Sequence, residues 1–166
     1  MLHKLSLFGI GGQLFTSIES FLNGRSQRVI VGNAISNSLP LTSGVPQGSV
    51  LGPFLFLLYI NDLPSILSPS IHCKLFADDA KLYNVTDYRL DPTMTQAALT
   101  ALANWSTEWQ LNLSISKCGS LLLSGTKNFS EETVLQVDNI DLEIFADAED
   151  LGVFIDSKLT FSINIV

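Results

Sequence analysis

The chain has 166 residues, of which 46% are hydrophobic and 15% charged, a composition typical of a globular protein and not of a disordered one. The formal net charge is −7 at pH 7, the opposite sign to that of most nucleic-acid-binding domains. This charge is uneven, because residues 1–74 hold four basic and two acidic side chains (net +2), whereas residues 75–166 hold five basic and fourteen acidic ones (net −9).

The first forty residues predict a helix followed by two short strands. The amino terminus has no apolar run with a cleavage site, so we recognise no secretion signal and expect an intracellular protein. Gly11-Gly12 opens a stretch with apolar residues at helical spacing, and Asn23-Gly24 ends it. Strands are expected at residues 28–31 and 38–41, around a turn at Gly32-Asn33. Nearby, Arg25 and Arg28 are either phosphate contacts or ordinary surface residues.

A second helix is expected up to Ile60, with Ser49 as its N-cap and Pro53 in its first turn. It is apolar on every side, so we expect it to be buried on most of them. Its apolar stretch is about half as long as a membrane-spanning helix, and we expect no membrane association. Just ahead of it, Gln47 offers both a donor and an acceptor, and Gly48 lets another group approach the backbone. This segment is either a nucleotide- or template-binding loop or a simple connection.

The most informative segment is Phe76-Ala77-Asp78-Asp79. Apolar and polar residues alternate on both sides of it, from Ile71 to Val85, which predicts two strands joined by a tight turn. Two adjacent carboxylates on a hairpin offer the hard oxygen ligands that Mg²⁺ prefers. In phosphoryl transfer, a pair of metal ions stabilises both the attacking and the leaving oxygen. The alternative is a solvated Asp-Asp turn with no ligand.

The second half predicts one long helix and several short strands. Asp91-Pro92 is a typical helix start, and the apolar stripe that follows should pack on the back of the sheet, opposite the carboxylates. Asp138-Asn139 is a favourable hairpin turn, and residues 126–132 are the most loop-like. These elements predict an α+β fold, an antiparallel sheet with helices packed on one face. The stripe consists of Met94, Ala98, Leu102, Trp105 and Trp109, and the further strands are expected at residues 121–123, 134–137, 140–144 and 152–155.

Several of these segments, in the same order, resemble the palm motifs of reverse transcriptases, most closely those of non-LTR (LINE-type) retrotransposons of animals. The resemblance covers nearly the whole chain and implies that residues 1–166 are a partial reverse transcriptase domain built on a polymerase palm. The segments that carry it are GVPQGSVLGP at 44–53, FLFLLYINDLP at 54–64, FADD at 76–79, LNLSISKC at 111–118 and LGVFIDSKLTF at 151–161.

The resemblance implies an RNA-directed DNA polymerase that acts on an RNA template, a DNA primer and deoxynucleotides. In such an enzyme the primer 3′-hydroxyl attacks the incoming deoxynucleotide and pyrophosphate leaves, with Mg²⁺ or Mn²⁺ as cofactor. Asp78 would be the catalytic metal ligand, and Asp79 a weaker metal contact or a support. Pro46, Gln47 and Gly48 would shape the nucleotide and template pocket. Lys117 would lie near the triphosphate, unless it is a surface lysine.

Members of this family carry another metal-binding aspartate on a strand before the first helix. This chain has no Asp before Asp62 and no Glu before Glu19. The resemblance therefore implies a palm that lacks the first catalytic strand, the fingers and the full thumb, and it leaves open whether residues 1–166 are themselves an enzyme. Two alternatives stand beside the polymerase: a catalytically inactive retroelement relic, and a protein-interaction module that uses an exposed sheet edge. From the acidic charge we expect weak or no nucleic-acid binding by these residues alone.

Overall fold

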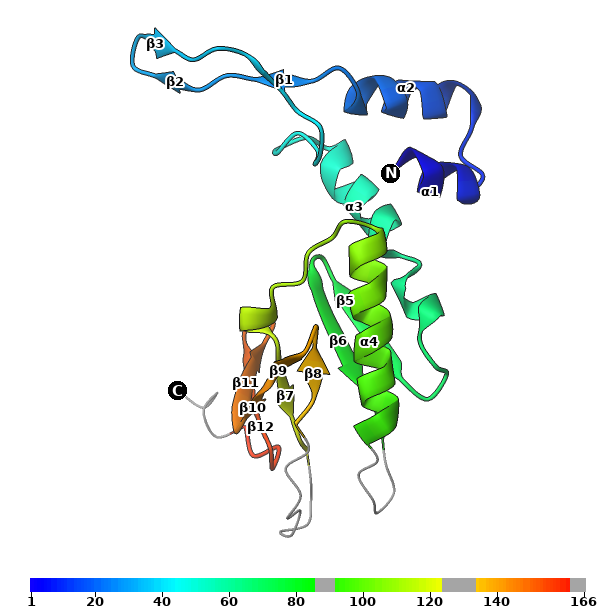
Figure 1. Cartoon of the computed structure of the whole chain (residues 1–166), viewed down its shortest axis with the longest axis vertical. Helices are drawn as coiled ribbons and strands as arrows, with labels where there is room; N and C mark the ends of the chain where they lie inside the picture. Colours follow the sequence, from blue (N-terminus) through cyan, green and yellow to red (C-terminus); the bar gives the residue numbers. More distant parts are fainter. Residues whose placement is uncertain (86–91, 124–133, 162–166) are drawn as a thin grey trace. The chain divides into compact units, whose positions relative to one another are not determined.

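A computed structural model of the protein describes residues 1–85, 92–123 and 134–161. The chain divides into two compact units, drawn in Figure 1. The first comprises Met1–Asp62 together with Phe76–Asp79, and the second comprises Leu63–Leu75 and Ala80–Val166. Helices alternate with small, mostly antiparallel strand pairs, which confirms the predicted α+β class. No helix in the described ranges has both the length and the apolar character needed to cross a membrane.

Three helices form the core of the first unit. They are α1 (Leu2–Leu7), α2 (Gly12–Leu22) and α3 (Leu51–Ile60). One residue from each of them is buried at their junction: Leu5, Ile18 and Leu55. As the sequence predicts, α2 begins after Gly11 and ends before Asn23. This small core orients the start of α3, and therefore also the loop that precedes it.

A narrow two-stranded ribbon follows α2 within this unit (Figure 1). Its pairs are β1 (Ser26–Gln27) with β4 (Leu39–Pro40) and β2 (Ile30–Val31) with β3 (Ala34–Ile35), both antiparallel. The expected turn at Gly32-Asn33 is present, but the partner of β2 is residues 34–35 and not residues 38–41. A two-residue turn pairs the residues directly next to it, which explains the difference.

The expectation that the apolar helix α3 is buried on most sides is wrong within the first unit. Leu55 and Ile60 are buried, whereas Phe54 and Leu57 are more than half exposed, and Val50, just before the helix, is 91% exposed. The cause is that α1 and α2 supply the core on one side of α3 only. A uniformly apolar sequence therefore does not say how many sides of a helix its neighbours cover.

The second unit begins with a 3₁₀ turn and most of a hairpin, whose turn at Phe76–Asp79 belongs to the first unit, and it continues into the longest helix of the described chain. The hairpin strands are β5 (His72–Phe76) and β6 (Asp79–Tyr83), and η1 (Leu63–Ile66) precedes them. Helix α4 runs from Pro92 to Glu108, and the centre of its predicted stripe is buried as expected, at Ala98, Leu102 and Trp105. The expected cap, Asp91, lies outside the described residues.

Short strands complete this unit. Val137 and Leu142 pack against Ala103 of α4, and the Gln96 amide of α4 exchanges two hydrogen bonds with the backbone of Gln136, at 2.8 and 2.9 Å. The strands are β7 (Gly119–Leu121), β8 (Gln136–Val137), β9 (Ile140–Asp141), β10 (Glu143–Phe145), β11 (Asp147–Asp150) and β12 (Val153–Asp156), with η2 (Ile115–Lys117) before β7.

The sheet differs from the single antiparallel sheet that the sequence predicts. In the part of the chain that the structure describes, the strands form six separate two-stranded sheets, and β7 pairs with β10 in parallel. The β8–β9 turn at Asp138-Asn139 is present as predicted. Strands of two to five residues carry little information about a distant partner, so the sequence predicts local hairpins better than the order of the sheet. The loop expected at residues 126–132 lies outside the described residues.

Candidate active site

The two candidate catalytic aspartates lie at a hairpin turn, as the alternating sequence predicts. Strand β5 ends at Phe76, Ala77 and Asp78 form the turn, and β6 begins at Asp79. Both carboxylates are exposed. Ala77 has a φ of 49°, in the left-handed region, which costs an L-residue roughly 1–2 kcal/mol. The turn that presents the carboxylates is therefore held in a conformation that alanine does not prefer.

The hairpin has one covered face and one open face. Cys73 and Leu75 on β5 and Leu82 on β6 are half-buried, whereas the residues that alternate with them are exposed. On the open face the rings of His72 and Tyr83 stack with their centroids 4.8 Å apart. Because side chains two residues apart share a face, Asp79 lies on the same open face as Tyr83.

The cation nearest in sequence to the two aspartates already has an anionic partner. Lys81 follows Asp79 by two residues, shares its face, and forms an ion pair with Asp150 at the end of β11. Its positive charge is therefore balanced within the second unit. The exposed carboxylates of Asp78 and Asp79 are open to solvent and accessible to a bound cation.

The loop that carries Pro46, Gln47 and Gly48 precedes α3 in the same compact unit as the Asp-Asp turn. Gln47 is exposed, so its amide is available to a ligand. Gly48 has a φ of +80°, a backbone conformation that side chains rarely adopt, which explains glycine at this position. Ser49 does not act as the helix cap residue itself, but its Oγ accepts the N–H of Gly52 at 3.1 Å. That Gln47 faces the same side as Asp78 stays a prediction.

Lys117 is the remaining candidate from the sequence. It ends η2 and is exposed, and its backbone N–H donates to the carbonyl of Ser114 at 2.9 Å. It belongs to the second unit, whereas Gln47 and Asp78 belong to the first. A contact between Lys117 and a triphosphate therefore stays a prediction.

The residues present fit a divalent cation only in part. Asp78 and Asp79 supply hard oxygen donors, the ligand type that Mg²⁺ and Mn²⁺ favour. In the described ranges, however, no group of three or more His, Cys, Asp or Glu side chains is arranged to hold a metal ion. Mg²⁺ takes about six oxygen ligands, so two carboxylates leave room for water and for substrate phosphates.

Comparison with known proteins identifies the family. A model described as reverse transcriptase (RNA-dependent DNA polymerase) matches residues 1–142, and this range contains the Asp-Asp turn and the Gln47 loop. The chain belongs to the reverse transcriptase family. The resemblance to LINE-type retrotransposons is likewise confirmed, because the curated relatives include RNA-directed DNA polymerases of the mobile element jockey and of the transposon X-element.

Three relatives from Drosophila melanogaster illustrate the similarity. The chain is 30% identical over 161 residues to the RNA-directed DNA polymerase from mobile element jockey, with 92% of this chain covered. It is 30% identical over 156 residues (91% of this chain) to the probable RNA-directed DNA polymerase from transposon X-element. It is 31% identical over 159 residues (87% of this chain) to that from transposon BS. The chain spans 17% of the length of each of these relatives.

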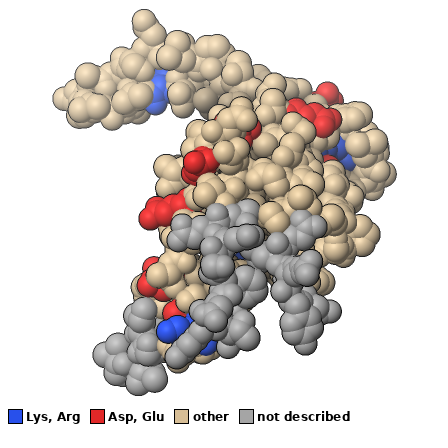
Figure 2. All heavy atoms as spheres, turned by 60° about the horizontal axis from the view of Figure 1, so that its bottom comes forward, with Lys and Arg blue, Asp and Glu red and all other residues tan. Residues whose placement is uncertain are grey.

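The surface of this reverse transcriptase segment carries few basic side chains. In the view of Figure 2, the lysines and arginines are scattered among uncharged residues and form no broad basic surface on that face. This agrees with the net charge of −7. On the face in this view, no broad basic surface is therefore offered to the phosphates of a duplex.

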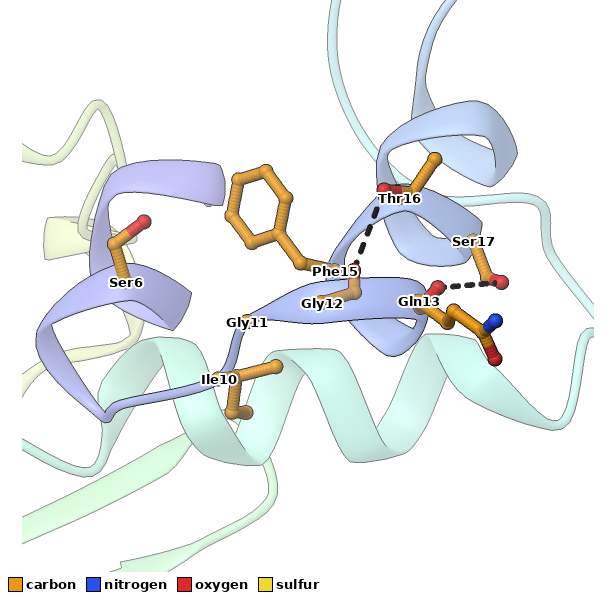
Figure 3. A pocket seen from close by; sticks show the side chains of 8 residues that line it. All are labelled: Ser6, Ile10, Gly11, Gly12, Gln13, Phe15, Thr16 and Ser17. Carbon is orange, nitrogen blue, oxygen red and sulfur yellow. Dashed lines mark hydrogen bonds between the residues drawn. The ribbon is translucent and has the colours of Figure 1, made fainter.

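One hollow of the first unit lies away from the candidate residues. It is an open depression of about 870 Å³ where α2 begins, shown in Figure 3. The hydroxyls of Thr16 and Ser17 beside it donate to the backbone carbonyls of Gly12 and Gln13, at 3.3 and 2.9 Å. These donors are used within the helix itself, and none of the six candidate residues lines this hollow.

Arg25 has a role in the structure that neither sequence alternative, a phosphate contact or an ordinary surface arginine, describes. Its guanidinium donates to the backbone carbonyls of Leu22 and Gly44, at 2.8 and 2.6 Å, so these donors are used within the protein. The sequence contained the signal, because an arginine just after a helix commonly caps the last helical carbonyls. Its contact with a residue nineteen positions away is a tertiary feature.

Proposed function

We propose that this chain supplies the palm segment of an RNA-directed DNA polymerase from a LINE-type retroelement. The observation that carries the proposal is the exposed pair Asp78 and Asp79 at the turn of a hairpin, within a chain of the reverse transcriptase family. Exposed carboxylates at a hairpin turn leave their oxygens open to a metal ion, and the family match favours this use over a solvated turn.

In the proposed reaction a primer 3′-hydroxyl attacks the α-phosphate of a deoxynucleotide, and pyrophosphate leaves. Asp78 would hold Mg²⁺ or Mn²⁺, with Asp79 as a weaker contact or support. When bound, the metal would stabilise the negative charge that develops on the reacting oxygens. Pro46, Gln47 and Gly48 would orient the nucleotide and the RNA template. Lys117 would help to neutralise the triphosphate.

For residues 1–166 by themselves we expect only weak metal binding and no polymerase activity. Two carboxylates provide too few ligands, and the net charge of −7 repels primer and template. Titration with Mn²⁺ should broaden the amide resonances of Asp78 and Asp79, and Asp78→Ala should remove this effect. Broadening that persists in Asp78→Ala would contradict the metal assignment.

Activity should be tested in a longer polypeptide in which these residues replace the matching segment of the RNA-directed DNA polymerase from mobile element jockey. The assay measures incorporation of labelled deoxynucleotide on poly(A)/oligo(dT) with Mg²⁺ or Mn²⁺. Asp78→Ala should abolish incorporation, whereas Asp138→Ala should leave it unchanged. Asp138 is a matched control, because it is also an exposed aspartate at a two-residue hairpin turn. Equal effects of the two substitutions would refute the catalytic role, and no incorporation by the longer polypeptide would favour a relic.

A further inference from the structure

The loop at residues 43–49 is attached to the fold at its beginning by Arg25. The Nε–H of this side chain donates to the carbonyl of Leu22, in the last turn of α2, at 2.8 Å. Its Nη2 donates to the carbonyls of Gly44 at 2.6 Å and of Ser43 at 3.4 Å. Leu22 belongs to the last turn of its helix, whose carbonyls lack intrahelical partners, and a cation there is favourable. One planar group therefore joins the end of α2 to the start of the 43–49 loop.

The end of the same loop is attached to α3 through Ser49. The Ser49 Oγ donates to the carbonyl of Pro46 at 2.7 Å and accepts the N–H of Gly52 at 3.1 Å. Gly52 is buried, and a Cβ there would lie 3.0 Å from Ser49 Oγ and 3.2 Å from Val45 Cγ2. The loop thus lies directly on the first turn of α3, and an added methyl group would require Ser49 or Val45 to shift by a few tenths of an ångström.

Only four residues, Val45 to Gly48, lie between these two attachments. Gln47 is exposed, yet its backbone is held from both sides within a few residues. A binding group on such a segment needs little ordering when its ligand arrives. On a free loop, only a fraction of the conformers can bind the ligand, and the apparent affinity falls in proportion to that fraction.

We propose that Arg25 is a positioning residue that fixes the 43–49 loop, and with it Gln47, for contact with a nucleotide or template base. This inference rests on the proposed polymerase function. Arg25 acts through backbone carbonyls and not through substrate phosphate. Arginine suits the task because its planar fork reaches several carbonyls at once, whereas the lysine ammonium is a point charge on a flexible stem.

The experiment compares Arg25→Lys with Arg28→Lys, since both substitutions keep the positive charge. Arg28 is an exposed arginine on the same ribbon, for which the structure shows no hydrogen bond or ion pair among the described residues. In the 166-residue chain, ¹⁵N relaxation should report a Gln47 order parameter falling from about 0.85 towards 0.6 in Arg25→Lys, and no change in Arg28→Lys. Amides of α4 should be unaffected in both variants. Gly52→Ala, which displaces Ser49, should reproduce the loss of order from the other end of the loop.

The second measurement uses the longer polypeptide that incorporates deoxynucleotide. Arg25→Lys should raise KM for the deoxynucleotide several-fold with a smaller change in kcat, because a disordered loop reduces the competent fraction before binding. Arg28→Lys should change neither parameter. An unchanged Gln47 order parameter in Arg25→Lys, or equal effects of the two substitutions, would overturn the proposal, as would loss of order with no change in KM. If the longer polypeptide shows no incorporation, the polymerase proposal fails by itself, and the relaxation data still decide whether Arg25 fixes the loop.

Discussion

The buried pair Lys4–Asp62 gives the sharpest test of the first unit. The Lys4 side chain is 1% exposed, and its Nζ lies 2.7 Å from Asp62 Oδ1 and 2.5 Å from the carbonyl oxygen of Tyr59. It also lies 4.6 Å from the centre of the Tyr59 ring. Asp62 is 33% exposed, so water reaches the carboxylate but not the ammonium. We therefore predict that Asp62→Ala destabilises the fold more than Lys4→Met.

The magnitudes follow from what each substitution leaves behind. Asp62→Ala leaves the buried ammonium without its carboxylate. Removing one partner of a buried ion pair typically costs about 3–5 kcal/mol. The Tyr59 carbonyl and ring still stabilise the charge, so we expect a cost of about 3 kcal/mol. Lys4→Met fills the apolar space of the lysine stem and leaves a carboxylate that water can solvate, with a cost of about 1 kcal/mol. The difference of about 2 kcal/mol is large compared with the usual error of such measurements.

The assay is urea unfolding followed by far-UV circular dichroism, together with amide exchange in α1 and α3. The double variant Lys4→Met/Asp62→Ala completes the cycle, and we expect it to be more stable than Asp62→Ala alone, because it removes the stranded charge. A larger loss in Lys4→Met than in Asp62→Ala would show that the ammonium is not the desolvated partner and would refute the reasoning.

Three further outcomes are expected. The pKa of Asp156 is lowered from 3.8 to about 2, mainly because the Thr160 hydroxyl donates a hydrogen bond to its carboxylate. The stabilisation that this carboxylate gives the turn is therefore fully present above pH 3.8 and is lost as the pH falls through about 2. Thr160→Val should raise the NMR titration midpoint, and an unchanged midpoint would contradict this cause. Gly119→Ala should lower the free energy of unfolding by about 1–3 kcal/mol, measured by thermal unfolding, because the added Cβ would lie 2.1 Å from Phe145 Cε2. If the substitution lowers this free energy by as much in a Phe145→Ala background, the clash is not the cause. Burial raises the pKa of both cysteine thiols, so at pH 8 they should react with a disulfide reagent more slowly than a cysteine peptide does, and equal rates would argue against buried thiols.

The elements that the sequence predicts correctly depend on interactions between residues close together in the chain. The hairpin around Asp78 is visible because alternation and a tight turn act within fifteen residues. The stripe on α4 is visible because residues three or four positions apart share a helix face. For the same reason the exposure of Asp78 and Asp79 could be predicted, together with the loop before α3.

Contacts between distant segments were decided by the tertiary structure. Lys4 and Asp62 are 58 positions apart, and neither residue indicates its partner. The parallel pairing of β7 with β10 and the exposure of Phe54 on the apolar helix α3 are likewise absent from any local pattern. A side chain could contact any of several chemically similar partners, and the fold of the intervening chain decides which one it meets. The entropic cost of closing a loop grows only slowly with the length of the loop, so many alternative pairings have similar costs. The residue types and their spacing therefore determine the family and the candidate carboxylates, whereas the packing of α1, α2 and α3 determines that Arg25 holds the loop and that Lys4 is buried.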